Sequence, residues 1–451
     1  MRNAIALLGF LALVTGTRPV AAEAAPDLQQ LWQLVQQQQA TIDQLSHKLD
    51  RALARLDDTQ TKLSGTEQAL AANTQKIEAT ADAVEAGIAK PKAVAATWAE
   101  RTSLGGYGEL AYNNLHDSAI ADGQRDNVDR TDFKRFVLYF NHEFNDWLRF
   151  GSELEVEHVV VSSDPKDPGE VALEQAWLEM DMKGSHRLRV GLDLLPLGIL
   201  NQTHEPNTFY GVERNPVETE IIPSTWWEAG TAVRGDLASG LGYDLVLHTG
   251  MVMPVVGDDA FRPRKGRTEI AAADNQDVAL SARLRYTAIP GLELAVAGQY
   301  QADYTGIHDR DLPGAAAAAY LLETHLDYRH SSGLGLRGLY AHWHFGADRA
   351  HGLDPGARNA DNQDGWYLEP AYRFDLRGLL PGEAGVFARY SRWDQVDGLG
   401  LRFRQFERVN LGMNYWPAPQ VVFKIDGQWE NANGVVRSEL DGFNLGVGYQ
   451  F

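Results

Sequence analysis

The sequence predicts an all-β fold, a 16-stranded antiparallel transmembrane β-barrel preceded by an α-helical coiled coil. Three observations lead to this prediction. The last nine residues, 443–451, alternate between apolar and small or polar side chains, as a strand does with one face in lipid and the other in water. Sixteen alternating segments of this kind follow residue 102. A long run with aliphatic residues at every seventh position comes before them.

The first 24 residues have the pattern of a secretory signal peptide. Arg2 provides a positive start, residues 5–14 are apolar, and small residues follow at Ala21, Ala22 and Ala24. After residue 20, no stretch approaches the roughly 18–20 apolar residues that a membrane-spanning helix needs. A lipid-embedded chain of this kind needs a closed barrel, because an open sheet edge would leave backbone groups unpaired.

Residues 25–90 carry a seven-residue repeat that predicts a coiled coil in the periplasm. The positions that recur in every heptad are all aliphatic: Leu28, Val35, Ile42, Leu49, Leu56, Leu63, Leu70, Ile77 and Val84. The companion positions begin apolar, with Leu31 and Leu45, and become mostly polar from Thr59 on, so the helix is expected to need a partner. A single amphipathic helix lying on another part of the chain is the alternative. Pro91 ends the helical pattern, and residues 91–102 are predicted to be a linker.

Residues 103–451 are predicted to form the transmembrane β-barrel porin domain. The alternating segments are 103–115, 131–144, 147–161, 171–182, 187–194, 226–236, 241–250, 278–287, 292–304, 318–329, 334–345, 365–376, 384–393, 403–415, 421–430 and 440–451. The connections between them alternate between short and long. An even strand number with short turns at one end and long loops at the other is typical of transmembrane barrels.

The charged faces of these segments are expected to line water. In residues 187–194, Leu188 and Val190 lie on one face and Arg187 and Arg189 on the other. A basic side chain that faced lipid at mid-membrane would cost about 2–4 kcal/mol. A barrel of 16 strands is wide enough for an aqueous channel, so the pattern predicts a porin architecture.

The longest loop, residues 195–225, is the third outer loop when strands are counted from the N-terminus. Four prolines in the loop favour a shaped segment that folds into the barrel and narrows it. A loop packed over the rim is the alternative. The candidate constriction residues are His204, Glu205, Glu213, Arg214, Glu218 and Glu220.

The segment GLDLLPLGILNQ (191–202), the run WWEAG (226–230) and the terminal strand resemble the phosphate-selective porin O and P family of Gram-negative bacteria. The resemblance covers residues 103–451 and implies a homotrimer in the outer membrane, in contact with lipid and lipopolysaccharide. It also implies that basic residues of the inner wall conduct anions. The matching candidates are Arg135, Arg149, Arg187, Arg189, Arg234, Arg283, Arg285, Arg373 and Arg389. Pairing of each arginine with a neighbouring carboxylate is the alternative.

The charge balance of the chain leaves the ion selectivity open. Of 41 basic and 61 acidic residues, 10 and 11 precede residue 103, so the barrel segment carries 31 and 50, a formal charge of −19. The loop 195–225 holds one arginine against four glutamates, which favours cations or neutral solutes, because charges at a constriction set selectivity. The basic residues of the barrel are mostly arginine, which favours oxyanions.

The predicted function is passive diffusion of small hydrophilic solutes or ions through an outer-membrane channel. An anion- or phosphate-selective channel and a tether to the cell wall through the coiled coil are alternatives. The chain has no cysteine, which excludes thiolate chemistry, and no GxSxG-type arrangement suggests a barrel enzyme. No catalytic residue, cofactor, metal or nucleic-acid partner is expected.

Overall fold

A computed structural model describes residues 98–117, 127–159, 169–255, 259–268, 277–306, 317–346, 362–397, 402–433 and 439–451. These residues belong to one compact unit, Ala96–Phe451. The predicted signal peptide (1–24), the predicted coiled coil (25–90) and most of the predicted linker lie outside the described residues.

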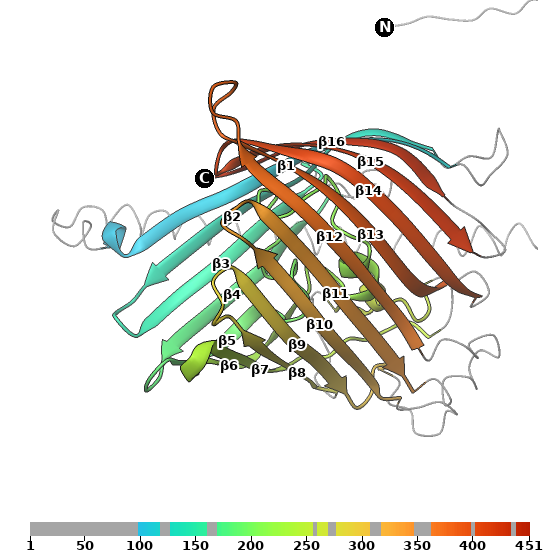
Figure 1. The fold of residues 1–451 in the computed structure, drawn as a ribbon. Coiled ribbons are helices and arrows are strands. Elements are labelled where there is room, and N and C mark those ends of the chain that lie inside the picture. The colour runs from blue at the N-terminus through green and yellow to red at the C-terminus, as the bar shows by residue number, and fades with distance from the viewer. Residues whose placement is uncertain are drawn as a thin grey trace, which may run out of the picture. The chain divides into compact units, whose positions relative to one another are not determined.

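Sixteen strands form one closed antiparallel barrel in which each strand pairs with its neighbours in sequence (Figure 1). The strands are β1 (Thr102–Asp117), β2 (Val128–Glu143), β3 (Leu148–Glu157), β4 (Val171–Asp181), β5 (His186–Leu194), β6 (Trp227–Asp236), β7 (Leu241–His248), β8 (Ala279–Tyr286), β9 (Leu292–Gln301), β10 (Ala319–Arg329), β11 (Leu334–Phe345), β12 (Asn362–Asp375), β13 (Glu383–Asp397), β14 (Arg402–Ala418), β15 (Val421–Asn433) and β16 (Leu440–Gln450). The barrel closes where β1 pairs with β16, with Tyr107 opposite Gln450. The predicted 16-stranded fold is confirmed, and every predicted strand end lies within four residues of the observed one.

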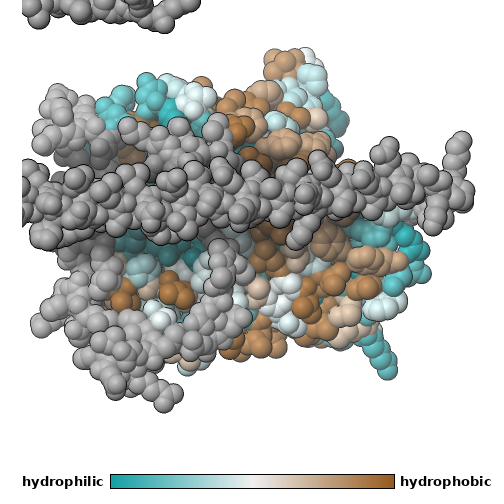
Figure 2. Space-filling model, turned by 180° about the vertical axis from the view of Figure 1, so that it is seen from behind, coloured by the Kyte–Doolittle hydropathy of each residue, from teal (hydrophilic) through white to brown (hydrophobic). Residues whose placement is uncertain are grey.

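The barrel is apolar outside and polar inside, the reverse of a water-soluble protein. Large apolar side chains are exposed on the outer face of most strands, among them Leu138 on β2, Leu245 on β7, Leu322 on β10 and Phe423 on β15. Many buried side chains are charged or polar. Figure 2 shows hydrophobic residues over a broad area of the wall and hydrophilic residues gathered at its margin. Among the described residues, no helix is long and apolar enough to cross a membrane.

The connections alternate in length as predicted. At one end, only two residues separate β14 from β15, and four separate β10 from β11. At the other end, residues 195–226 separate β5 from β6. This long connection includes a short π-helical turn, η1 (Val217–Ile221). The connection between β7 and β8 includes a 3-10 turn, η3 (Pro263–Gly266).

Two register shifts add polar groups to the inner face of the wall. The pairing of β1 with β2 shifts between Glu109 and Leu110, opposite Lys134. As a result, Lys134 and its neighbour Arg135 both reach inner-face partners. The pairing of β3 with β4 shifts between Glu153 and Leu154, opposite Glu174. Each irregularity is a β-bulge, which turns an extra side chain inward.

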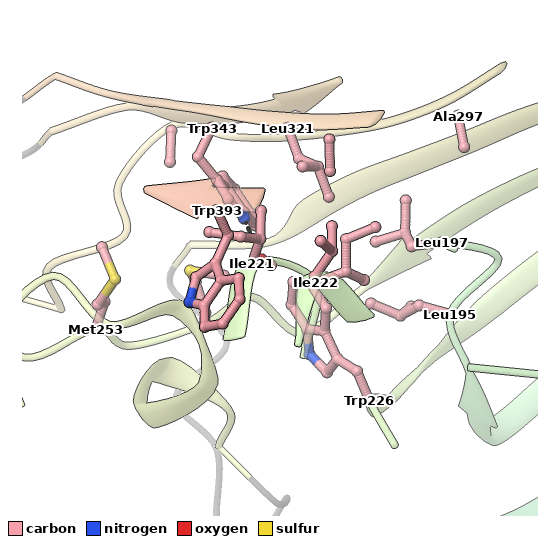
Figure 3. Close-up of a cluster of buried hydrophobic side chains, with 14 of the residues drawn as sticks. Leu195, Leu197, Ile221, Ile222, Trp226, Met253, Ala297, Leu321, Trp343 and Trp393 are labelled. Atoms are coloured by element: carbon pink, nitrogen blue, oxygen red, sulfur yellow. Dashed lines mark hydrogen bonds between the residues drawn. The ribbon is translucent and has the colours of Figure 1, made fainter. Parts of the chain in front are cut away.

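Part of the barrel interior is a hydrophobic core, which the sequence patterns did not predict. Residues of the loop 195–225 pack against apolar inner-face residues of β10, β11 and β13. Figure 3 shows Ile221 and Ile222 near Leu321 and Trp343 of the wall, with Trp226 at the end of the loop. The indole N–H of Trp343 donates a hydrogen bond to the backbone oxygen of Ile221 (2.8 Å). Near the loop, these strands are therefore apolar on both sides, because their outer side chains are exposed on the wall and their inner side chains pack against the loop.

Candidate functional site

The loop between β5 and β6 crosses the interior of the barrel. At its base, the backbone N–H of Leu195 donates to the oxygen of Trp226 (3.0 Å). The buried side chain of Asn201 joins both ends, because its amide group donates to the oxygens of Leu195 (2.8 Å) and Trp226 (3.0 Å). Its side-chain oxygen accepts from the backbone N–H of Trp226 (2.6 Å). The loop thus leaves the wall as a closed, fixed unit.

Glu218 holds the middle of the loop together. Its Oε1 accepts hydrogen bonds from the backbone N–H groups of Ile199 (2.5 Å) and Leu200 (2.6 Å). Its Oε2 accepts from Asn215 (2.8 Å) and from the hydroxyl of Tyr367 on β12 (2.8 Å). Four donors satisfy this buried carboxylate, so its contacts are structural.

The tip of the loop is fastened to strands far from β5 and β6. The backbone N–H of Val212 donates to Oδ2 of Asp426 on β15 (2.7 Å). Asn414 on β14 donates to the oxygen of Phe209 (3.0 Å), and Arg389 on β13 donates to the oxygens of Tyr210 and Glu213 (3.3 Å each). These contacts show that the loop folds into the barrel, and the alternative of a loop over the rim is excluded.

A second loop, between β7 and β8, also reaches the first. Arg264 donates to the backbone oxygen of Ser224 (2.8 Å), and Arg267 donates to the oxygen of Thr225 (2.6 Å). Arg262 forms an ion pair with Glu220 (3.4 Å). No sequence pattern predicts this contact, because the loop is rich in charge and lacks a regular apolar pattern.

A cavity of about 350 Å³ lies between the inward loops and the wall formed by β1 to β4. Its acidic lining residues are Glu109, Glu155, Glu157, Glu170, Glu174, Glu213 and Glu220. Its basic lining residues are Lys134, Arg135, Arg214, Arg264, Arg267 and Arg408. Both signs of charge are therefore present in nearly equal number around this space.

The acidic groups of the inward loop are largely neutralised by contacts. Glu213 pairs with Lys134 and accepts a hydrogen bond from Asn113 Nδ2 (2.8 Å). Burial raises the pKa of Glu213, but Lys134 and Asn113 together lower it to about 2. Its carboxylate therefore stays ionised at neutral pH and is bound to the wall.

Two arginines of the loops lack such neutralisation. Within the described part of the chain, neither Arg214 nor Arg264 forms an ion pair, and each donates only to a backbone oxygen, Arg214 to that of His204 (3.4 Å). Burial lowers the pKa of both arginines. Repulsion from Arg135 lowers the pKa of Arg214 further, and repulsion from Arg267 does the same for Arg264. Among the basic side chains that line the cavity, the positive charges of these two arginines are therefore the least balanced by carboxylates.

All nine arginines proposed as solute contacts pair with carboxylates. The pairs are Arg135 with Glu109 (3.4 Å) and Glu155 (3.3 Å), Arg149 with Glu179 (3.0 Å), Arg187 with Asp236 (3.9 Å), Arg189 with Glu179 (2.7 Å), Arg234 with Asp193 (2.6 Å), Arg283 with Asp244 (2.9 Å), Arg285 with Asp236 (3.1 Å), Arg373 with Glu383 (2.6 Å) and Arg389 with Glu369 (3.1 Å). Of the nine, Arg135 lines the cavity of about 350 Å³. Arg283 and Arg285 line a second cavity of about 470 Å³, and Arg373 lines a third of about 140 Å³.

The six loop candidates divide into two groups. Glu213, Arg214 and Glu220 line the cavity. His204 and Glu218 are buried and contact protein groups, and Glu205 lies near the hydroxyl of Tyr139 (3.5 Å). The sequence did not single out Lys134 or Glu174, because a bulge that turns a side chain inward breaks the alternation by which faces were assigned.

Comparisons with known proteins identify the fold. No protein-family profile matches the chain. An uncharacterized protein of Aquifex aeolicus is 29% identical over 339 residues, which cover 72% of this chain and 74% of the relative. OmpF of Salmonella typhi, solved in complex with daunomycin, aligns with a TM-score of 0.51 at 12% identity, covering 78% of this chain and 97% of OmpF. The structure therefore shares the fold of this outer-membrane protein.

Two further solved structures have lower TM-scores. The outer-membrane channel DcaP of Acinetobacter baumannii aligns at 0.49 with 13% identity, covering 78% of this chain and 97% of DcaP. An anion-selective porin from Comamonas acidovorans aligns at 0.49 with 13% identity, covering 78% and 99%. The resemblance to the phosphate-selective porin O and P family stays a prediction.

Proposed function

We propose that the protein is an outer-membrane porin that lets small hydrophilic solutes or ions diffuse through the barrel. The observation that carries this proposal is the inward loop, which crosses a barrel with an apolar exterior and bounds a cavity lined by charged groups. An apolar exterior favours a lipid environment, and charged inner groups favour water. The loop would restrict the size of the solutes that pass.

Recording from planar lipid bilayers tests the proposal. Purified, folded protein is expected to produce discrete, stepwise increases in conductance. Protein that is shown to be inserted and folded, but that passes no more current than the empty bilayer, would contradict a channel function. A lipase or protease assay on the same sample then tests a barrel enzyme.

We propose a homotrimer surrounded by lipid and lipopolysaccharide. An apolar hollow of about 490 Å³ on the outer wall supports this, since it gathers exposed side chains of β1, β14, β15 and β16. Its lining includes Leu110, Met413, Phe423 and Leu445. Native mass spectrometry in detergent would distinguish a trimer from a monomer, and lipid alone would fill the hollow in a monomer.

The selectivity of the channel is proposed to be weak, because the cavity holds seven acidic and six basic side chains. The acidic charge of the loop 195–225 supports a preference for cations. The absence of ion pairs at Arg214 and Arg264, among the residues described, supports the alternative of an anion- or phosphate-selective channel. The reversal potential in a salt gradient separates these cases, and competition by phosphate against the chloride current tests phosphate itself.

The segment 25–90 is proposed to lie in the periplasm as a coiled coil that contacts the cell wall. Deletion of this segment is expected to leave the conductance intact while it reduces trimer stability or association with peptidoglycan. If the deletion changes neither trimer stability nor association with peptidoglycan, the proposed role of the segment is wrong.

A further inference from the structure

Three side chains with metal-ligating groups meet inside the barrel. Glu153 comes from β3, Glu174 from β4 and His204 from the inward loop, and one ligand atom of each lies within 4.8 Å of the others. Nε2 of His204 is 3.3 Å from Oε1 of Glu153 and 3.9 Å from Oε2 of Glu174. All three side chains are almost fully buried, with at most 3% of their surface exposed.

The hydrogen bonding of His204 orients Nε2 as a ligand. Nδ1 lies 3.1 Å from the backbone oxygen of Asn201. A carbonyl oxygen only accepts, so Nδ1 carries the hydrogen and donates it. In the neutral ring, Nε2 then presents its lone pair to the two carboxylates. Metal-ligating histidines typically donate the other ring N–H to a backbone carbonyl or carboxylate in this way.

Glu174 is a buried carboxylate without a hydrogen-bond donor. Neither of its oxygens accepts a hydrogen bond from an N–H or hydroxyl donor, its side chain is fully buried, and the neighbouring Glu155 carboxyl interacts with it. It lies opposite the register shift between Glu153 and Leu154, so a β-bulge turns it into the barrel beside its neighbour Gln175. Burial of an unpaired carboxylate is costly unless a cation or proton compensates it.

The charges around the cluster leave an excess of negative charge. Glu109 and Glu155 pair with Arg135, and Arg214 donates a hydrogen bond to the backbone oxygen of His204. Together with Glu153 and Glu174, four carboxylates face two guanidinium groups. Oε2 of Glu153 accepts a hydrogen bond from Gln175, which holds that carboxylate in place and leaves Oε1 toward His204.

We propose that Glu153, Glu174 and His204 bind a divalent transition-metal ion, for which Zn²⁺ is the best match. Mixed nitrogen and oxygen ligands suit zinc, whereas Ca²⁺ and Mg²⁺ prefer oxygen ligands alone. Bonds of about 2.0–2.2 Å in a tetrahedral site place ligand atoms about 3.3–3.6 Å apart, near the 3.3 and 3.9 Å that separate Nε2 of His204 from the two carboxylates. Glu174 also lines the cavity of about 350 Å³ between the inward loops and the wall, which gives the ion a path of entry.

The metal would join the inward loop to β3 and β4. The tip of that loop is already fastened to β13, β14 and β15 by hydrogen bonds. A metal at His204 would fasten the loop to β3 and β4 as well, beside the Glu213–Lys134 pair that already joins it to β2. This inference does not depend on the proposed channel function, because metal binding is measured without any transport assay.

The alternative is that protons replace the metal, one on Nε2 of His204 and one between Glu155 and Glu174. His325 offers a matched comparison, since it is also buried with two carboxylates. Its Nδ1 lies 2.6 Å from Glu323 and its Nε2 3.2 Å from Glu293. Both ring nitrogens face carboxylates there, so a protonated ring satisfies that group without a metal.

The test measures zinc in untagged, full-length protein that has been folded, stripped with EDTA and dialysed against Zn²⁺. We expect about one zinc ion per chain by elemental analysis. His204→Gln and Glu174→Gln are each expected to weaken zinc affinity by at least the roughly 10–100-fold that loss of a supporting group causes. His325→Gln is the control and should retain wild-type affinity. Equal zinc binding by wild type, His204→Gln and His325→Gln would show adventitious binding and overturn the site.

A measurement on the wild type alone keeps the proposal testable if a variant fails to fold. X-ray absorption of the zinc-loaded protein is expected to show nitrogen and oxygen neighbours at about 2.0–2.2 Å, with the scattering of one imidazole. Protein that retains no zinc after dialysis, or zinc without an imidazole neighbour, would exclude the site.

Discussion

The backbone N–H of Val212 donates a hydrogen bond to Oδ2 of Asp426, 2.7 Å away, and so fastens the tip of the inward loop to β15. The loop begins at β5 and ends at β6. In the closed sheet, β4, β3, β2, β1 and β16 lie between β5 and β15 in one direction. The contact therefore spans the interior of the barrel, and it fixes the space that remains open.

Replacement of Asp426 is expected to release the tip of the loop. Asp426→Ala removes the acceptor of Val212 and also that of Asn410 (3.2 Å) and Asn444 (3.0 Å). Buried donors left without partners cost about 1–3 kcal/mol each. We expect larger current fluctuations in single-channel records and a lower urea midpoint. Asp375→Ala, at the half-exposed end of β12, is the control; an equal effect there would contradict the prediction.

The contribution of Glu213 to stability is expected to depend on pH. Its pKa in the folded protein is about 2, below the ordinary value of 4.5. A depressed pKa stabilises the folded state above pH 4.5, and this stabilisation is lost as the pH falls toward 2. The free energy of unfolding of wild type should exceed that of Glu213→Gln by about 2 kcal/mol at pH 7, as for a hydrogen bond to a charged group.

That difference should shrink below pH 4.5 and vanish near pH 2. Lys134→Met removes the partner cation and is expected to abolish the same pH dependence. A difference between wild type and Glu213→Gln that stays constant from pH 7 to pH 2 would argue against the pairing.

The base of the loop is expected to depend on Asn201. Asn201→Ala removes three buried hydrogen bonds with Leu195 and Trp226. Loss of one such partner costs about 1–3 kcal/mol, so we expect a loss of at least about 2 kcal/mol in a urea titration. Asn207→Ala is the control, because Asn207 bonds to Pro419 and Gln450 at a more exposed position. Near-equal losses of stability for both variants would show that the hydrogen bonds of Asn201 do not contribute more than those of an ordinary loop residue.

Arg264 is expected to influence the selectivity of the channel. A unit charge at about 4 Å in water is worth about 1 kcal/mol, which is roughly a five-fold change in local anion concentration. Arg264→Gln should therefore lower the permeability ratio of chloride to potassium by up to about that factor. Arg377→Gln, an exposed turn residue paired with Asp375, is the control. An unchanged reversal potential for Arg264→Gln would place the conducting path elsewhere.

A membrane location predicts opposite tolerance at two exposed leucines. Leu245 lies on the outer face of β7, whereas Leu379 lies in the turn between β12 and β13 and is 84% exposed. Leu245→Arg is expected to cost about 2–4 kcal/mol in lipid vesicles, and Leu379→Arg close to nothing. Folding titrations in urea measure both. Equal tolerance at the two positions would mean that β7 does not face lipid.

The sequence by itself determined the strand number, the order of the strands and the lengths of their connections. Strand pairing requires alternation, and alternation is readable residue by residue, as in Arg187 and Leu188 of β5. The faces of the arginines followed from the same rule. Their partners did not, because Glu179 and Asp244 come from neighbouring strands whose register the sequence leaves open.

Only the tertiary structure decided how the interior is filled. The sequence suggested an inward loop, but its contacts with Asp426 and Trp343 join residues more than a hundred positions apart. The bulges that turn Lys134 and Glu174 inward interrupt the alternation, so a rule that assumes strict alternation does not predict the face of these side chains. The charge of the loop therefore did not give the charge that a solute meets, since Lys134 neutralises Glu213 while Arg214 keeps its charge without a carboxylate partner among the described residues.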